Sequence, residues 1–104
     1  MVRMSIIKAL MLATLLATDS ASAEVTIGVS LGLNGRYAHP SGMQQRAYRL
    51  WERQINARGG LLGTPVKVEI RDDASDRTRA EQHYRQFTEG RVAQLVLGPY
   101  SSEL

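Results

Sequence analysis

Polar side chains that could bind or react with a ligand gather in three short stretches of this sequence. The first, Gly32–Pro40, holds Tyr37 and His39. The second, Asp72–Asp76, holds three carboxylates, and the third, Gly98–Ser102, holds two adjacent serines. Carboxylate clusters can hold a divalent cation, whereas hydroxyls beside unpaired backbone N–H groups favour an anion. The three stretches therefore offer candidate sites of different chemistry.

Two common motifs do not fit these residues. Gly28, Gly32 and Gly35 are spaced G-x-x-x-G-x-x-G, which is two residues longer than the dinucleotide fingerprint G-x-G-x-x-G, and the phosphate-loop lysine is missing. Ser101 and Ser102 do not stand in the G-x-S-x-G motif of many serine hydrolases. We therefore expect neither nucleotide binding nor serine-hydrolase chemistry.

The acidic stretch has a catalytic and a structural interpretation. Asp72, Asp73 and Asp76 could hold magnesium or accept a phosphoryl group, but phosphate-receiver domains carry their acid pair after the first strand, not the second. In the structural interpretation, Asp76 caps a helix while Asp72 and Asp73 fix a turn through side-chain hydrogen bonds. We favour the structural interpretation and predict no metal and no cofactor.

Composition narrows the class of protein further. The chain has 104 residues, enough for one small domain, with 13 Lys and Arg against 10 Asp and Glu. It has no cysteine, which excludes a disulfide framework, a thiol nucleophile and a cysteine zinc site. Its arginines are mixed with acids, so we predict no nucleic-acid partner.

The N-terminus has the pattern of an export signal. Met1–Lys8 carries two basic residues and no acid, Ala9–Ala17 is uncharged, and an A-S-A triplet follows. This pattern predicts a signal peptide over residues 1–23, cleaved after Ala23, and a periplasmic protein that is not embedded in the membrane. The alternative is an ordinary N-terminal helix that packs on the domain.

The remaining residues, 24–104, alternate between strand and helix patterns. We predict the order β-α-β-α-β. The strands are Val25–Leu31, Val66–Ile70 and Leu95–Leu97, the first helix lies between Ser41 and Gly59, and the second covers about Arg77–Glu89. Ser41 with Gln44 resembles a capping box that opens the first helix, and Gly59-Gly60 ends it. The fold class is α/β: a three-layer, partial doubly wound parallel sheet with strand order 2-1-3.

Periodicity predicts which helix faces pack on this sheet. In the first helix, apolar residues share the face that we expect to be buried: Met43, Ala47, Leu50, Trp51 and Ile55. In the second helix, which Asp76 caps, the inward residues are Ala80, His83, Tyr84 and Phe87.

The sheet should bring the three polar stretches together. Ligands of open α/β sheets bind beyond the carboxyl ends of the strands, near helix N-termini. Each polar stretch follows one predicted strand, so all three should lie at that edge. There Ser101 or Ser102 resembles a helix N-cap, an arrangement that suits a ligand carboxylate.

Four sequence pieces carry a family resemblance: Ile27–Val29 with Asn34-Gly35, Ile55–Gly63, Val68–Asp76 and Val96–Ser102. The chain resembles the N-terminal lobe of periplasmic solute-binding proteins of the branched-chain amino-acid and amide type, the leucine-binding-protein-like family that serves ABC transporters. The resemblance implies a two-lobed clamp that closes on its ligand by a hinge motion. It also implies a small amino acid or amide as ligand and a membrane permease as partner.

The resemblance implies site residues as well. Ser102 occupies the position from which such proteins present a hydroxyl and an N–H to the ligand carboxylate, and Ser101 and Tyr100 adjoin it. The stretch around Tyr37 and His39 would line the same cleft. Two positions depart from the family pattern: Pro40 replaces a common aromatic residue, which leaves the specific ligand open, and Arg77 replaces a common helix-initiating proline.

Length sets one more expectation. Family members run to several hundred residues, so we expect residues 24–104 to form a truncated N-terminal lobe that binds its ligand too weakly to work alone. Two alternatives stay open. One is a secreted α/β module that pairs with another protein through an open sheet edge, and the other is a small enzyme that uses Asp72, Asp73 or His39.

Overall fold

A computed structural model describes residues 23–104 of the chain. Its elements are β1 (Val25–Leu31), α2 (Ala38–Ala57), β2 (Val66–Asp72), α3 (Arg77–Thr88) and β3 (Leu95–Leu97). Apart from Ala23, the predicted signal peptide lies outside the described residues. None of the helices in this part of the chain is long and apolar enough to cross a membrane.

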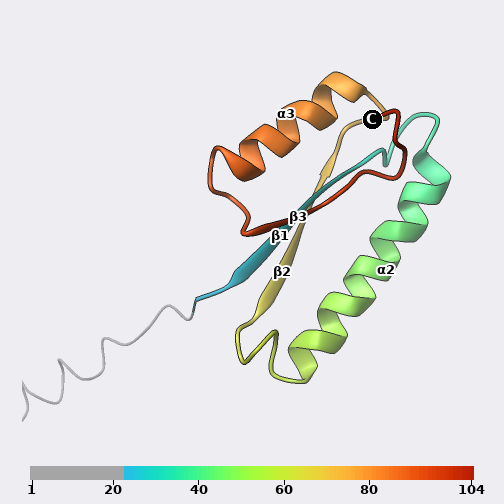
Figure 1. Cartoon of the computed structure of the whole chain (residues 1–104). Coiled ribbons are helices and arrows are strands. Elements are labelled where there is room, and N and C mark those ends of the chain that lie inside the picture. The colour runs from blue at the N-terminus through green and yellow to red at the C-terminus, as the bar shows by residue number, and fades with distance from the viewer. Residues whose placement is uncertain (1–22) are drawn as a thin grey trace, which may run out of the picture.

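The three strands form one parallel sheet in the order β2-β1-β3, which confirms the predicted topology. β1 pairs with β2 along its whole length, from Val25 beside Val66 to Leu31 beside Asp72. It pairs with β3 over three residues only, from Ile27 to Val29. The helices α2 and α3 lie on opposite faces of the sheet, so the molecule has the three expected layers (Figure 1).

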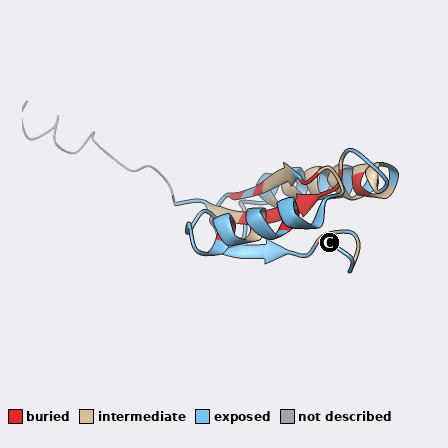
Figure 2. Ribbon diagram, turned by 90° about the horizontal axis from the view of Figure 1, so that it is seen from above, coloured by how far each residue is buried: buried red, intermediate tan, exposed pale blue. Residues whose placement is uncertain are grey.

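β1 has one face of large apolar side chains and one face with small residues, because successive side chains of a strand point to opposite sides. On the α2 side, Val29 and Leu31 are fully buried and form a cluster with Val68, onto which Tyr48 packs. On the α3 side, the same strand presents Gly28 and Ser30 to α3. Figure 2 shows the buried residues in red along the centre of the molecule, between the helices.

At Gly28, a side chain of α3 lies directly against the backbone of the sheet. A Cβ atom at this position would lie 2.6–2.8 Å from the ring of Phe87, which is itself fully buried. Only glycine leaves room for the ring to lie against the backbone of β1. The predicted inward face of α3 is confirmed for Phe87 and Ala80, while His83 and Tyr84 are half-buried.

The start of α2 differs from the prediction. The helix begins at Ala38, and Tyr37 precedes it without a side-chain cap. Ser41 is therefore a buried residue inside the helix, its N–H donating to the Tyr37 carbonyl, and the predicted capping box is wrong. Pro40 did not delay the helix because proline is tolerated in a first turn, where its missing N–H has no helical partner.

The inward face of α2 also differs from the prediction. Met43, Leu50 and Trp51 are 55%, 49% and 38% exposed. Polar side chains face the free edge of β2 instead: Asn56 accepts the Val66 N–H and donates to the Val66 carbonyl, both at 2.8 Å. Strand edges need partners for their backbone groups, and this need outweighs the apolar periodicity.

One helical turn from Asn56, a charged pair covers the next residue of the edge. Glu52 accepts the Val68 N–H at 2.5 Å, and Arg49 donates to the Val68 carbonyl at 2.7 Å. Glu52 and Arg49 also contact each other at 3.3 Å. The free edge of β2 is thus covered at Val66 and Val68 by side chains of α2.

The opposite edge of the sheet is exposed. All three residues of β3 are apolar, yet Leu95, Val96 and Leu97 are 52%, 43% and 36% exposed. Strands of a parallel sheet are normally covered on both faces. Within residues 23–104, β3 has one paired neighbour, β1.

We expect Asn56→Ala to lower the free energy of unfolding by about 1–2 kcal/mol, because it removes both hydrogen bonds to Val66. Urea denaturation followed by circular dichroism measures the change. Gln54→Ala is the matched control, since Gln54 is exposed on the same helix. Equal stability of the two variants would contradict the edge-covering role of Asn56.

We expect Gly28→Ala to destabilise the fold by about 1–3 kcal/mol, because the new methyl group overlaps the Phe87 ring. Combining it with Phe87→Leu should cost less than the sum of the two single changes. Gly42→Ala is the control: its nearest atom would lie at 3.8 Å, an ordinary contact, so it should be neutral or stabilising. Thermal denaturation of the four variants provides the comparison.

Candidate functional site

Three loops meet at the carboxyl end of the sheet, where the strand order predicted them. They follow β1, β2 and β3 and span residues 32–37, 73–76 and 98–104. Close backbone and side-chain contacts join the first loop to each of the other two.

Asp72 ties the first loop to the second. Its carboxylate accepts the Leu33 N–H at 3.0 Å, the Asn34 side-chain amide at 2.5 Å and the Ala74 N–H at 2.8 Å. Burial opposes its ionisation, but the hydrogen bonds from Asn34, Ala74 and Leu33 outweigh burial and hold the pKa of Asp72 below its usual value. Asp72 is thus ionised, and its hydrogen bonds hold the two loops together.

Ser75 is the second link between these loops. Its hydroxyl donates to the Asn34 carbonyl at 2.6 Å and accepts the Tyr37 N–H at 3.1 Å. A Cβ atom on Gly32 would lie 2.6 Å from this hydroxyl, and one on Gly35 would lie 2.9 Å from the Ala74 carbonyl. The glycines of the first loop therefore serve close packing of two backbones.

Asp73 belongs to a buried polar network beneath the loops. Ser30 and Asp73 are both fully buried, and the Ser30 hydroxyl donates to Asp73 at 2.8 Å. The same hydroxyl lies 2.9 Å from Nδ1 of His83, which must then donate. Burial and the nearby Arg71 lower the pKa of His83, so the neutral imidazole is favoured.

This network contains a serine, a histidine and an aspartate, but it is structural. Its hydroxyl lies between the other two groups and no substrate can reach it, because Ser30 is fully buried. Asp76 caps α3, accepting the Arg79 N–H at 2.8 Å. These bonds confirm the structural interpretation of the acidic stretch. Among residues 23–104, no three His, Asp or Glu side chains are grouped so as to hold a metal ion.

The third loop is joined to the first by aromatic and charged contacts. The rings of Tyr37 and Tyr100 lie 5.7 Å apart at an angle of 53°. The Tyr37 hydroxyl donates to Glu103 at 2.9 Å, and Arg36 forms an ion pair with the same carboxylate. The hydrogen bond from Tyr37 and the charge of Arg36 lower the pKa of Glu103. Arg36 and Glu103 were not predicted as partners, since 67 residues separate them and neither stands in a motif.

The two serines differ in their surroundings. Ser101 begins a turn, in which its hydroxyl accepts the Glu103 N–H at 3.2 Å and its carbonyl accepts the Leu104 N–H at 3.1 Å. The bond to Glu103 is of the kind that an N-cap residue makes. Ser102 is exposed. The turn thus occupies one serine and leaves the other accessible to a ligand.

The predicted site residues fall into two groups. Tyr37, Tyr100, Ser101 and Ser102 lie on the two loops that the Tyr37–Tyr100 contact joins. His39 lies in the first turn of α2 and is exposed, and within the described residues its ring forms no hydrogen bond. The geometry therefore supports the tyrosines and serines as one site more strongly than it supports His39.

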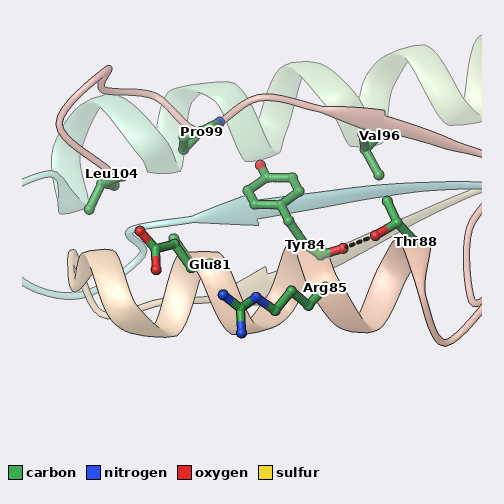
Figure 3. Close-up of a pocket in the computed structure, with 8 residues that line it drawn as sticks. Glu81, Tyr84, Arg85, Thr88, Val96, Pro99 and Leu104 are labelled. Carbon is green, nitrogen blue, oxygen red and sulfur yellow. Dashed lines mark hydrogen bonds between the residues drawn. The ribbon is translucent and has the colours of Figure 1, made fainter.

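A surface hollow of about 340 Å³ lies behind the third loop, between α3 and β3. Figure 3 shows Tyr84 at its centre, with Pro99 and Leu104 on the loop side and Val96 on the strand side. The hollow is mostly apolar and does not include the serines. It is thus a neighbour of the candidate site and separate from it.

Two comparisons place this arrangement among known proteins. Residues 24–104 match the family described as periplasmic binding protein. The fold is similar to that of LivJ, a branched-chain amino-acid transporter substrate-binding protein from Streptococcus pneumoniae solved in complex with isoleucine, with 26% sequence identity and a TM-score of 0.66.

The similarity covers 74% of this chain and 22% of LivJ. The matched part of this chain thus spans less than a quarter of LivJ's length. The family match nevertheless extends from the start of β1 to the last residue, across the sheet, both helices and all three loops. The chain belongs to the periplasmic binding protein family.

Proposed function

We propose that this chain forms one side of the binding site of a solute receptor, which takes a small amino acid or amide and delivers it to an ABC transporter permease. The observation that supports the proposal most directly is the joining of two loops at the carboxyl end of the sheet. The rings of Tyr37 and Tyr100 lie 5.7 Å apart there, and the exposed Ser102 follows Tyr100 by two residues on the same loop. The LivJ structure, which contains isoleucine, supports an amino acid as the ligand class.

The chemistry of the loops suits a ligand with a carboxylate and an apolar part. In this proposal, the ligand carboxylate accepts a hydrogen bond from Ser102. It also accepts one from the Ser101 hydroxyl, which serves only as an acceptor toward the Glu103 N–H and can still donate its proton. The rings of Tyr37 and Tyr100 offer an apolar surface beside them, because aromatic side chains contribute large contact areas. His39 would contact the ligand only from the rim. The chain performs no catalysis in this role.

The proposed site is open on one side. A hydrogen bond between two groups that both remain in water contributes little net free energy. Family members that close two lobes exclude this water, and the cost of ordering the ligand is offset on both sides. We therefore propose that residues 24–104 alone bind an amino acid weakly, with a dissociation constant on the order of 1 mM or higher.

The proposed location rests on the family and on the N-terminal sequence pattern. A receptor of this family meets its solute outside the cytoplasmic membrane, and the N-terminal pattern of residues 1–23 is that of an export signal. We propose a periplasmic protein released by cleavage after Ala23.

A second candidate function rests on the exposed strand. β3 is apolar and 36–52% exposed, as in sheets that add a strand from another protein. A secreted α/β interaction module would use this edge and would not need the serines.

We expect isoleucine at millimolar concentration to shift the NMR amide signals of Tyr37, Tyr100 and Ser102 without measurable heat in a calorimetric titration. Ser102→Ala should abolish the shift changes, because it removes the accessible hydroxyl. Thr78→Ala, an exposed change at the start of α3, is the control and should bind like the original chain.

Isoleucinamide, which lacks the carboxylate, tests the proposed anchor. It should cause weaker shifts than isoleucine at the same concentration. Shifts located at β3 and absent from the loops would favour the interaction module. Micromolar binding by the monomeric chain would contradict the one-sided site.

A further inference from the structure

Direct pairing between β1 and β3 ends abruptly below the candidate site. The paired residues of β1 are Ile27, Gly28 and Val29, and pairing stops there although β1 continues to Leu31. β3 ends at Leu97, the partner of Val29. The two strands therefore separate at the point where the third loop begins.

A tyrosine hydroxyl bridges the strands at this point. The first N–H of β1 beyond the paired residues is that of Ser30, and it donates to the Tyr84 hydroxyl at 3.2 Å. The same hydroxyl donates to the Leu97 carbonyl at 2.5 Å. Figure 3 shows Tyr84 rising from α3 with its hydroxyl toward the ribbon near Pro99.

Other contacts fix both the Ser30 end and the Tyr84 ring of this bridge. On the β1 side, Ser30 is fully buried and its hydroxyl is fixed by Asp73 and His83. On the α3 side, the ring of Tyr84 packs edge-on against the buried Phe87 at 5.9 Å. The hydroxyl cannot move far without disturbing one of these contacts, so the Leu97 carbonyl is held at a set distance from β1.

From these contacts, we infer that Tyr84 is a positioning residue: its hydroxyl sets the separation of β1 and β3 and thereby the place of the loop that carries Ser101 and Ser102. The loop has few other restraints at its start, since a Cβ atom on Gly98 would meet nothing within 4 Å. That this loop binds a ligand rests on the proposed function, but its position can be measured without any ligand.

The test is Tyr84→Phe in the full chain, which keeps the ring and removes only the hydroxyl. We expect exchange of the Ser30 amide proton to accelerate roughly fivefold to tenfold, as the loss of one hydrogen bond implies. We also expect the NMR amide signals of Ser101 and Ser102 to shift, because Leu97 is released. If the proposed function holds, isoleucine affinity falls as well.

Tyr48→Phe is the matched control. Tyr48 is a half-buried tyrosine on the opposite face of the sheet, packed on the Val29, Leu31 and Val68 cluster. Its change should leave the Ser101 and Ser102 signals in place even if it lowers stability equally. A purely structural role of Tyr84 would make the two variants alike at the serines, and that result would overturn the inference.

A measurement on the unchanged chain keeps the inference testable if Tyr84→Phe does not fold. The hydroxyl proton of Tyr84 should exchange slowly and show a nuclear Overhauser contact to the Ser30 amide proton. A freely exchanging hydroxyl would also overturn the inference. Failure of isoleucine to bind, with the loop displaced as expected, would instead count against the proposed function alone.

Discussion

The central constraint of this fold is that β1 has a paired strand on each side and a helix packed on each face, with β2 paired along its whole length and β3 over three residues. Each side chain of β1 must therefore fit the space beside one of two helices, α2 or α3. The α2 side takes large apolar side chains. On the α3 side, Phe87 lies against the backbone at Gly28 and the Tyr84 hydroxyl bonds to the N–H of Ser30, so small residues stand at these two positions. The distance between α3 and the sheet is thus determined by the small residues Gly28 and Ser30.

This constraint extends to the candidate site. The loops after β1 and β2 pack so closely that Gly32 and Gly35 have no room for a side chain beside Ser75 and Ala74. Ala74 and Ser75 adopt left-handed φ angles of 53° and 60°, which is uncommon for residues other than glycine. Hydrogen bonds from the Ala74 and Ser75 amides to Asp72 and Asp73 accompany this conformation. The third loop joins them through side chains instead.

Sequence patterns were sufficient for the order of the elements, the parallel sheet and the Asp76 cap, because these depend on local periodicity and on short capping signals. They failed for α2, where Trp51 is exposed and Asn56 faces the sheet, because the unpaired edge of β2 is a tertiary demand that helical periodicity does not contain. They also missed Ser30 and Arg36. Ser30 pairs with Asp73 and His83, and Arg36 pairs with Glu103. These partners lie more than 40 residues away, and no spacing rule connects them.

The Asn56 contacts make the two edges of the sheet unequal in their ability to accept a further strand. An asparagine side chain has the same donor and acceptor as a peptide group, and Asn56 offers both to Val66 where a fourth strand would otherwise pair. Within residues 23–104, these contacts hinder addition of a strand at β2 beside Val66 and Val68, whereas β3 has no strand on its far side. Fibre formation that needs two free sheet edges is accordingly disfavoured, and the edge at Leu95–Leu97 is the one open to a further strand among the described residues.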